Sequence, residues 1–321
     1  MSDRIKLDVV LTLVTFGFLC PSCNSADRQD EDPTIGEPGK GKPTVAVVNY
    51  PLKYFVERVA GDEVDVLFPV PAEVDPAYWK PEAEDVAAYQ RADLILLNGA
   101  SYAKWVDSAT LSRSRLVNTS VQFTDRLILI EDAVTHSHGP GAEHGHGSVA
   151  FTTWLDPMLA IEHASSVRDA LVQLLPDLDT TFNQNLTALR DDLLDLDEKY
   201  LELVREYERA PILASHPVYQ YFASRYGLNL RSVHWEPSQI PDQKQWRDLD
   251  RILGEHPAAW MIWEAPPLDE TRARLAERGI QCVVFETCGS EPSGRDYIES
   301  MRSNAARLEP VFHGPKLRVA H

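Results

Sequence analysis

Short runs of apolar, β-branched residues alternate along the chain with segments of helical spacing. In the first half, apolar runs at residues 44–48, 64–68 and 93–98 enclose helical spacing at residues 52–60 and 81–91. The second half repeats this order, with apolar runs at residues 211–215, 259–263 and 281–285 and helical spacing at residues 218–226, 268–278 and 295–308. Because such alternation is typical of buried parallel strands covered by helices, the pattern predicts an α/β fold with two doubly wound lobes.

The clearest periodic segment lies between the two halves. Apolar side chains recur there every three or four residues, at Phe182, Leu186, Leu189, Leu193, Leu196, Tyr200, Leu203 and Tyr207. This spacing predicts one amphipathic helix of roughly 28 residues, or about 42 Å in length. A coiled coil is the competing interpretation, but a single segment between two α/β halves favours one long connecting helix.

These patterns divide the chain into parts. We expect an N-terminal lobe over residues 44–165, a linking helical segment over residues 166–209 and a C-terminal lobe over residues 210–312. A short tail follows at residues 313–321. Residues 24–43 are polar and rich in Asp, Gly and Pro, which predicts a disordered tether.

The N-terminus is typical of an export signal. Arg4 and Lys6 precede an apolar run at residues 9–19 that is too short to span a bilayer comfortably. Cys23 follows the small Ser22, as the acylated cysteine of a lipoprotein follows a small residue. We expect residues 1–23 to be a lipoprotein-type signal peptide that leaves the protein in the periplasm or lipid-anchored at the outer face of a membrane. Ordinary signal cleavage nearby is the alternative.

Charge and cysteine content narrow the partners. The formal net charge is −18 at pH 7, which argues against nucleic acid as a partner and attracts cations weakly. Beyond the predicted signal, the cysteines are Cys282 and Cys288. In an oxidising compartment they can form a disulfide, or they can be buried as small apolar residues.

A histidine-rich segment at residues 135–147 contains His136, His138, His144 and His146, separated by Gly and Pro. Neutral imidazole is the commonest protein ligand for zinc-like metals, and a Gly-rich tether allows several imidazoles to converge on one ion. The segment therefore predicts an accessory metal-collecting loop, with a solvated low-complexity loop as the alternative.

Several motifs resemble the zinc/manganese class (cluster A-I) of ABC-transporter solute-binding proteins. They occur in family order and are found at residues 74–81, 92–100, 154–157 and 215–228. The resemblance implies two α/β lobes joined by a rigid long helix, and a Zn²⁺ or Mn²⁺ ion held between them as the transported ligand. It also implies delivery of that ion to a membrane permease driven by an ATPase, by a protein that we expect to be a monomer.

The same resemblance implies three histidines and one carboxylate at the metal, and this chain departs from it twice. Ala77 and Thr152 stand at two of the expected histidine positions, whereas His216 fits the third and Glu286 the carboxylate. Alanine has no metal-binding group, and a neutral Thr hydroxyl is a poor zinc ligand.

Further candidates exist to complete the site. Glu264 and His234 both follow extended segments, and strand ends are where open α/β sheets bind ligands. We therefore predict His216, Glu286, His234 and Glu264 as the metal site. We expect His163, His256, His313 and His321 to be surface residues.

Three function classes compete. An exported metal-binding protein for zinc-type uptake is the leading hypothesis. A binding module whose cleft holds an organic ligand or a protein partner against Tyr78, Trp79, Trp235 and Trp263 is the second. An enzyme with His216 as base is the third, and we expect no enzyme because neither a nucleophile elbow nor a phosphate loop accompanies this residue.

Overall fold

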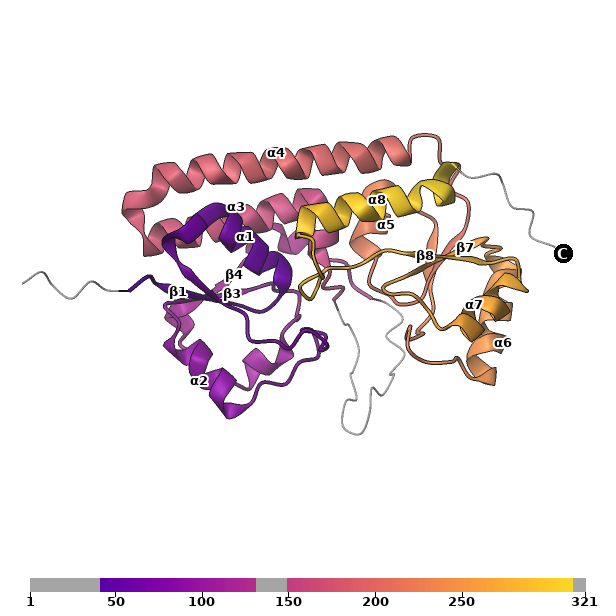
Figure 1. The fold of residues 1–321 in the computed structure, drawn as a ribbon, viewed down its shortest axis with the longest axis horizontal. Coiled ribbons are helices and arrows are strands. Elements are labelled where there is room, and N and C mark those ends of the chain that lie inside the picture. The colour runs from indigo at the N-terminus through magenta and orange to yellow at the C-terminus, as the bar shows by residue number, and fades with distance from the viewer. Residues whose placement is uncertain (1–40, 131–148, 314–321) are drawn as a thin grey trace, which may run out of the picture. The chain divides into compact units, whose positions relative to one another are not determined.

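The computed structural model describes residues 41–130 and 149–313. Within these ranges, each half of the chain builds a four-stranded parallel sheet with helices on both faces (Figure 1). The two parallel-sheet α/β lobes predicted from the apolar runs are therefore confirmed. The predicted signal peptide, Cys23 and the histidine-rich loop lie outside the described residues.

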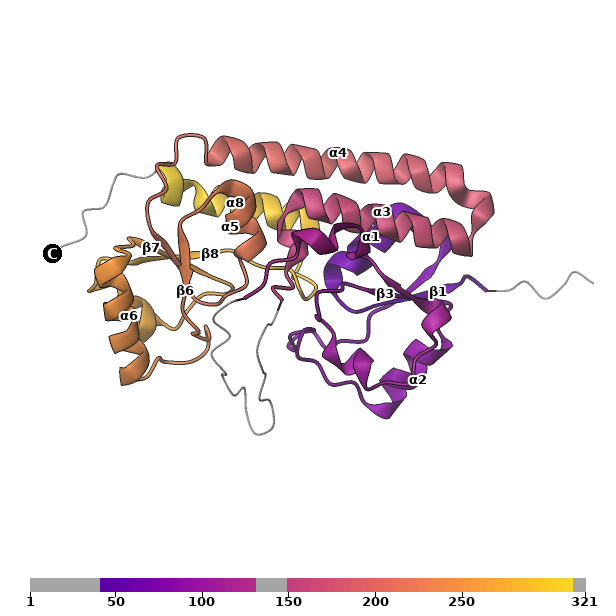
Figure 2. The ribbon, with the colours of Figure 1, turned by 180° about the vertical axis from the view of Figure 1, so that it is seen from behind.

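The N-terminal sheet has the strand order β2-β1-β3-β4. Its strands are β1 (Thr44–Val47), β2 (Asp65–Leu67), β3 (Leu94–Leu97) and β4 (Leu116–Asn118). The central strand β1 pairs with both β2 and β3, and Val45 lies opposite Val66 on one side and Leu94 on the other. Because β1 is buried on both faces, helices α1 (Tyr50–Ala60) and α3 (Pro157–Leu174) cover one face and α2 (Ala83–Arg91) covers the other (Figures 1 and 2).

The C-terminal sheet repeats this arrangement with the order β6-β5-β7-β8. Its strands are β5 (Ile212–Ala214), β6 (Leu230–Ser232), β7 (Trp260–Trp263) and β8 (Gln281–Val284). Helices α5 (Gln220–Tyr226) and α8 (Tyr297–His313) cover one face, and α6 (Gln243–Glu255) and α7 (Asp269–Ala276) cover the other (Figures 1 and 2). Short 3-10 helices complete the described elements: η1 (Gly61–Glu63), η2 (Lys104–Asp107), η3 (Arg113–Arg115), η4 (Val121–Arg126), η5 (Thr153–Leu155) and η6 (Pro176–Leu178).

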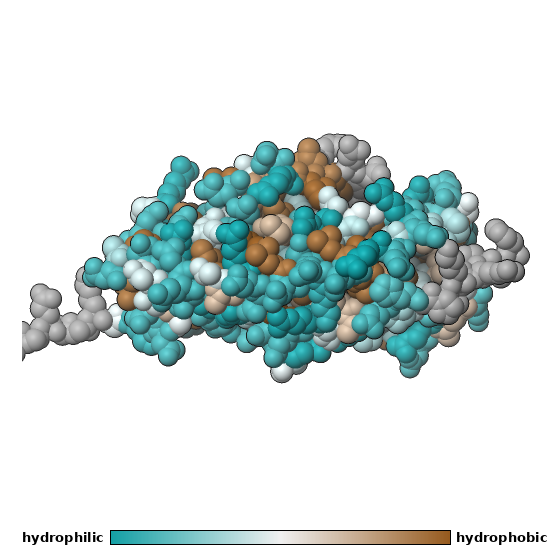
Figure 3. Space-filling view, turned by 90° about the horizontal axis from the view of Figure 1, so that it is seen from above, coloured by the Kyte–Doolittle hydropathy of each residue, from teal (hydrophilic) through white to brown (hydrophobic). Residues whose placement is uncertain are grey.

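Helix α4 (Asp179–Leu203) follows α3 after a tight turn and runs along both lobes (Figure 1). It has 25 residues, and Tyr207 of the predicted stripe lies beyond its end. The buried residues of α4 belong to one apolar core that also contains Val45 of the first sheet and Ile212 of the second. The surface seen from the side of α4 is mostly hydrophilic, as its acidic outer positions require (Figure 3).

A buried carboxylate fixes α4 to the C-terminal lobe. Asp197, which is 5% exposed, accepts hydrogen bonds from Arg225 Nε at 2.9 Å and from the Tyr226 hydroxyl at 2.9 Å. Burial of a carboxylate is tolerated where charged and polar donors compensate the lost hydration. This contact therefore fixes the position of α4 as well as contributing to its packing.

Two histidines that we expected at the surface are buried, so that expectation was wrong. The ring of His163 lies between Thr119 Oγ1 at 2.7 Å from Nδ1 and Thr153 Oγ1 at 2.8 Å from Nε2. Because the Thr119 hydroxyl donates to Leu97 O, we assign Nδ1 as the donor to Thr119 and Nε2 as the acceptor from Thr153. Burial lowers the pKa of His163 to about 3. His256 is also buried, against the Ile212 carbonyl, whereas His313 is exposed as expected.

Other expectations concern the cysteines and the membrane. Cys282 and Cys288 are both free thiols, so the disulfide alternative is not realised in this structure. Cys288 is buried as a small apolar residue, and burial raises its pKa to about 12. Among the described residues, no helix has the length and apolar character needed to cross a membrane.

The packing of α4 makes a testable prediction. Leu193 is fully buried, whereas its neighbour Leu194 is 37% exposed. We expect Leu193→Ala to lower the free energy of unfolding by about 2–5 kcal/mol, because it removes packed methyl groups and leaves a cavity. The matched control Leu194→Ala should change it by less than about 1 kcal/mol. Urea unfolding measures both, and equal losses would contradict the assigned helix face.

The buried His163 predicts a pH dependence. Its folded-state pKa lies below its unfolded value, so its contribution to stability is present above about pH 6.5 and is lost as the pH falls towards 3. Between pH 7 and pH 5, the wild type should lose about 2 kcal/mol more unfolding free energy than His163→Gln. His313→Gln, at an exposed position, should keep the wild-type slope. Urea unfolding at the two pH values checks this, and identical slopes for wild type and His163→Gln would refute it.

Candidate metal site between the lobes

The candidate donors of the C-terminal lobe lie where its strand order reverses. His216 follows β5 and Glu264 follows β7, the two central strands of the sheet. His234 and Glu236 follow the edge strand β6. Because all these strands are parallel, their carboxyl ends meet at one edge, which is where open α/β sheets bind ligands.

His216 is the centre of this group. Its side chain is 14% exposed, with Nδ1 at 3.3 Å from Glu264 Oε1 and Nε2 at 3.5 Å from Glu236 Oε1. The rings of His216 and His234 are 6.1 Å apart between centroids and perpendicular. The structure thus brings together three of the four predicted ligands, namely His216, His234 and Glu264, and adds Glu236.

The carboxylates change the ionisation of the imidazole. Burial lowers the pKa of His216, but the hydrogen bond and negative charge of Glu264 oppose it, with further contributions from Glu236 and Asp75. The net effect is a pKa above the ordinary value of a histidine. A positive charge is therefore favoured at this place, whether a proton or a metal ion supplies it.

The N-terminal lobe contributes Asp75, which the sequence reasoning did not select. Asp75 Oδ1 accepts a hydrogen bond from the Ala77 amide at 2.9 Å, which orders the loop after β2. Desolvation raises the pKa of Asp75; the Ala77 hydrogen bond opposes this shift, and the charge of Glu264 adds to it. Ala77 stands at an expected histidine position, and Asp75 lies two residues before it. This proximity was the sequence signal that could have identified Asp75 as a candidate.

The two substituted positions have structural roles. Ala77 is buried at 7% exposure, and Tyr78 beside it is 54% exposed. Thr152 is buried, and its hydroxyl donates to the Val218 carbonyl, which joins a segment of the N-terminal half to the C-terminal lobe. Both positions therefore hold the fold together without supplying a metal ligand.

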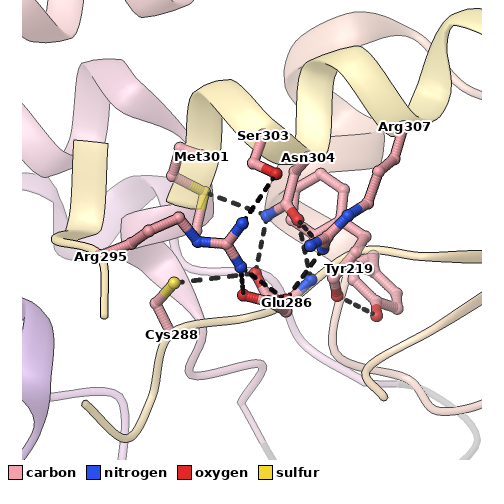
Figure 4. Close-up of polar contacts among 9 residues, drawn as sticks. Tyr219, Glu286, Cys288, Arg295, Met301, Ser303, Asn304 and Arg307 are labelled. Atoms are coloured by element: carbon pink, nitrogen blue, oxygen red, sulfur yellow. Dashed lines mark hydrogen bonds and ion pairs between the residues drawn. The ribbon is translucent and has the colours of Figure 1, made fainter. Parts of the chain in front are cut away.

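Glu286, the carboxylate predicted from the family pattern, lies apart from the other three. It follows β8, but its side chain points to α8 and accepts from Arg307 Nη1 at 2.9 Å and from Arg295 Nη2 at 3.2 Å (Figure 4). Its backbone amide donates to Asn304 Oδ1 at 3.0 Å (Figure 4). The two guanidinium groups already compensate the charge of Glu286, because bidentate and charge-assisted hydrogen bonds are the strong ones.

At the carboxyl ends of the two central strands of the N-terminal sheet, the side chains are asparagines. Asn49 follows β1 and Asn98 follows β3, and Asn49 Nδ2 donates to Asn98 Oδ1 at 3.1 Å. Both side chains are buried, and Asn98 Nδ2 also donates to Phe151 O at 3.0 Å. Neutral amides satisfy each other there, so the ionisable half of the site belongs mainly to the C-terminal lobe.

A cavity of about 1230 Å³ joins these residues to the N-terminal lobe. Asp75, His216, Glu236 and Glu264 are among its lining residues. Most of the other lining residues belong to the N-terminal lobe and include Trp79, Lys80, Lys104 and Trp105. Trp79 was expected from the sequence as possible aromatic surface, whereas neither lysine nor Trp105 was predicted.

The turn after β3 precedes two of the residues that line the cavity and has a strained backbone. Gly99, Ala100 and Ser101 after β3 all have positive φ values, of 76°, 50° and 58°. A Cβ on Gly99 would lie 1.9 Å from Ser120 Oγ, so glycine is required there. Two residues after this turn, η2 begins at Lys104 and also carries Trp105.

The donor chemistry fits a divalent ion, although the coordination shell is not formed. Within the described residues, no three His, Cys, Asp or Glu side chains are already arranged to hold a metal. Glu264 and Glu236 contact opposite nitrogens of the imidazole, so only one of them can share an ion with His216. Imidazole and carboxylate are nevertheless the ligand types that zinc and manganese accept.

Two α/β lobes, one helix along both and an ionisable cleft at the strand ends define a two-lobed solute-binding protein. The family described as "Zinc-uptake complex component A periplasmic" matches residues 45–310. The chain belongs to this family.

Curated relatives agree with this assignment. The zinc-binding protein AdcA of Streptococcus pyogenes serotype M1 is 26% identical over 288 residues, which cover 84% of this chain and 56% of that protein. The chain thus spans little more than half the length of that relative. The high-affinity zinc uptake system protein ZnuA of Bacillus subtilis is 26% identical over 300 residues, covering 91% of this chain and 93% of that one.

Solved structures show the same fold. The metal-dependent lipoprotein YcdH of Bacillus subtilis superposes with a TM-score of 0.71 at 25% identity, over 84% of this chain and 98% of that chain. The Zn(II)-bound ZnuA-like domain of Streptococcus pneumoniae AdcA gives 0.72 at 23% identity, over 85% and 99%.

The contacts of Glu286 allow a test of whether this residue is a metal ligand. We expect Glu286→Gln to destabilise the fold by about 1 kcal/mol, a modest loss because these side chains are about one-third exposed. Zinc affinity should stay within about threefold of wild type, since distant sites without shared partners act independently. Urea unfolding and a zinc titration measure the two effects.

A double-mutant cycle with Arg307→Gln supplies the control. Glu286 and Arg307 should be coupled in the free energy of unfolding and should show no coupling in zinc affinity. A tenfold weaker zinc affinity in Glu286→Gln would restore Glu286 as a ligand.

Proposed function

We propose that this chain captures a divalent transition metal, with zinc preferred, in the cleft between its lobes and delivers it to an ABC permease driven by an ATPase. The observation that carries the proposal is the convergence of His216 with carboxylates of both lobes. The zinc-binding names of its relatives support the metal, and family membership supports the permease. The metal is cargo here, so the site has to release it as well as bind it.

His216 Nε2 is the nitrogen ligand in this proposal. Glu264 holds the opposite ring edge, where Nδ1–H donates to its carboxylate. A carboxylate on the far nitrogen fixes the tautomer of a metal-bound histidine and increases its basicity. Glu264 is thus a positioning residue for His216, where the sequence had suggested a ligand.

Glu236 supplies the first oxygen ligand. Two ligands of one tetrahedral zinc, each about 2.0–2.2 Å from the ion, lie roughly 3.4 Å apart. The 3.5 Å between His216 Nε2 and Glu236 Oε1 agrees with that separation. Zinc would lie between His216 Nε2 and Glu236 Oε1 without a large movement of either side chain.

Asp75 and His234 are the groups that can complete the shell. Asp75 brings a carboxylate from the opposite lobe, which links metal binding to the approach of the lobes. His234 stands two residues before Glu236 on the same extended segment. A shell with more oxygen than nitrogen also accommodates manganese, which prefers carboxylates.

We also propose that the protein is exported and anchored to a membrane. Residues 1–23 act as the signal, Cys23 carries the lipid, and the protein works as a monomer at the outer face of a membrane or in the periplasm. Residues 135–147 act as an accessory loop in which His136, His138, His144 and His146 collect metal with low affinity. The domain boundaries at residues 165 and 209 stay as proposed from the sequence.

Zinc titration by calorimetry tests the ligand assignment. His216→Ala should weaken the tight site by more than about a hundredfold, because a principal ligand is lost, and Glu236→Gln by at least about tenfold. Glu264→Gln should stay within about tenfold of wild type, because its amide oxygen can still accept from Nδ1–H. His313→Ala, at an exposed histidine, is the control and should bind as wild type does.

Deleting residues 135–147 separates the site from the loop. The deletion variant should keep one tight zinc site that depends on His216 and lose only weak additional binding. Zinc binding that disappears with the loop, or that survives His216→Ala unchanged, would end the proposal. A parallel titration with manganese ranks the two metals.

A further inference from the structure

The cavity is much larger than a metal ion requires. It measures about 1230 Å³, whereas a water molecule takes about 30 Å³ of liquid and small-molecule pockets enclose roughly 300–1,000 Å³. The candidate metal ligands are only some of its lining residues. A metal ion alone therefore leaves most of the volume unexplained.

Aromatic side chains form one wall of that volume. Trp79 and Trp105 line it, and their rings meet edge to face with centroids 5.8 Å apart. Tyr89 packs behind Trp105 at 4.9 Å, and its hydroxyl donates to Val47 O. The wall is therefore rigidly supported by the N-terminal sheet, as expected of a surface preformed for an organic ligand.

The cavity is lined by charges of both signs. Asp75, Glu236 and Glu264 act on His216 with their negative charge, whereas Lys80 and Lys104 are the sequence neighbours of the lining residues Trp79 and Trp105. A bare cation matches only the carboxylates. A ligand with a cationic centre and anionic groups extending from it matches both the carboxylates and the lysines, because each charge then meets an opposite one.

The number of side chains that can bind the metal also favours an organic ligand in the cleft. Ala77 and Thr152 provide no imidazole, and Glu264 and Glu236 cannot both join His216 on one ion. Within the described residues, no third His, Cys, Asp or Glu side chain is already arranged around the same ion as His216 and Glu236, so the positions that Asp75 and His234 could complete are also open to other donors. Donor atoms of a second molecule can fill them, as water or substrate does in zinc sites with an open position.

We propose that the cleft binds its metal as a complex with an anionic, polycarboxylate-type organic chelator, and this inference rests on the proposed metal-capture function. His216 and Glu236 take coordination positions that the chelator leaves open. The chelator body lies against Trp79 and Trp105, and its carboxylates face Lys80 and Lys104. The two missing histidines are then replaced by donors that arrive with the cargo.

Zinc nitrilotriacetate is a suitable probe. This chelator supplies four donors, leaves coordination positions open and gives a complex of net charge −1. Equilibrium dialysis with radiolabelled nitrilotriacetate measures whether the protein retains the chelator. We expect retention only when zinc is present, at one chelator per zinc. Zinc EDTA, in which six chelator donors occupy the metal, should not be retained.

Two variants separate the parts of the cleft. Lys80→Met combined with Lys104→Met should reduce retention of zinc nitrilotriacetate at least tenfold and leave the affinity for zinc alone unchanged. Lys199→Met, on the exposed face of α4, is the matched control and should change neither. His216→Ala should abolish retention of the complex.

The outcomes distinguish the two proposals. If the protein binds zinc through His216 but releases it to nitrilotriacetate without retaining the chelator, the chelate proposal fails and metal capture stands. If neither zinc nor its complex binds, metal capture fails as well. Retention of metal-free chelator, or retention unaffected by the lysine variant, would overturn the proposed arrangement.

Discussion

The apolar core shared by the two lobes is the constraint on which the rest of the structure depends. Helix α4 buries Leu189, Leu193, Leu196 and Tyr200 in a core that reaches from the first sheet to the second. Asp197 adds a buried, charge-assisted contact to Arg225. Because burial of this continuous surface is what stabilises both lobes, the cleft between them has a defined geometry.

That geometry assigns different chemistry to the two sheets. Both reverse their strand order between their central strands, and both present polar side chains there. In the first sheet Asn49 and Asn98 satisfy each other. In the second, His216 and Glu264 are ionisable, and the negative surroundings favour a cation. The first lobe instead offers Trp79 and Trp105, so the ionisable and the aromatic linings of the cleft come mainly from different lobes.

Much of the fold could be predicted because its signals are local. Seven apolar or amphipathic segments of the second half and the linker correspond to β5, α5, β7, α7, β8, α8 and α4. The sequence pattern missed β4, a three-residue strand at a sheet edge, and α6, whose buried residues are limited to Trp246 and Leu249. A three-residue edge strand has too few apolar positions to show a period, whereas α6 carries Trp246, Leu249, Ile252 and Leu253 at helical spacing and could have been predicted.

The sequence by itself determined the α/β class, the two lobes and the long helix, and it named His216 as a candidate ligand, since periodicity and motif order are properties of neighbouring residues. Only the tertiary structure decided which side chains meet. It turned Glu286 towards Arg295 and Arg307, buried His163 between two threonines and brought Asp75 to the cleft. The physical reason is that a side chain's partners come from distant segments, whose approach depends on packing the whole core.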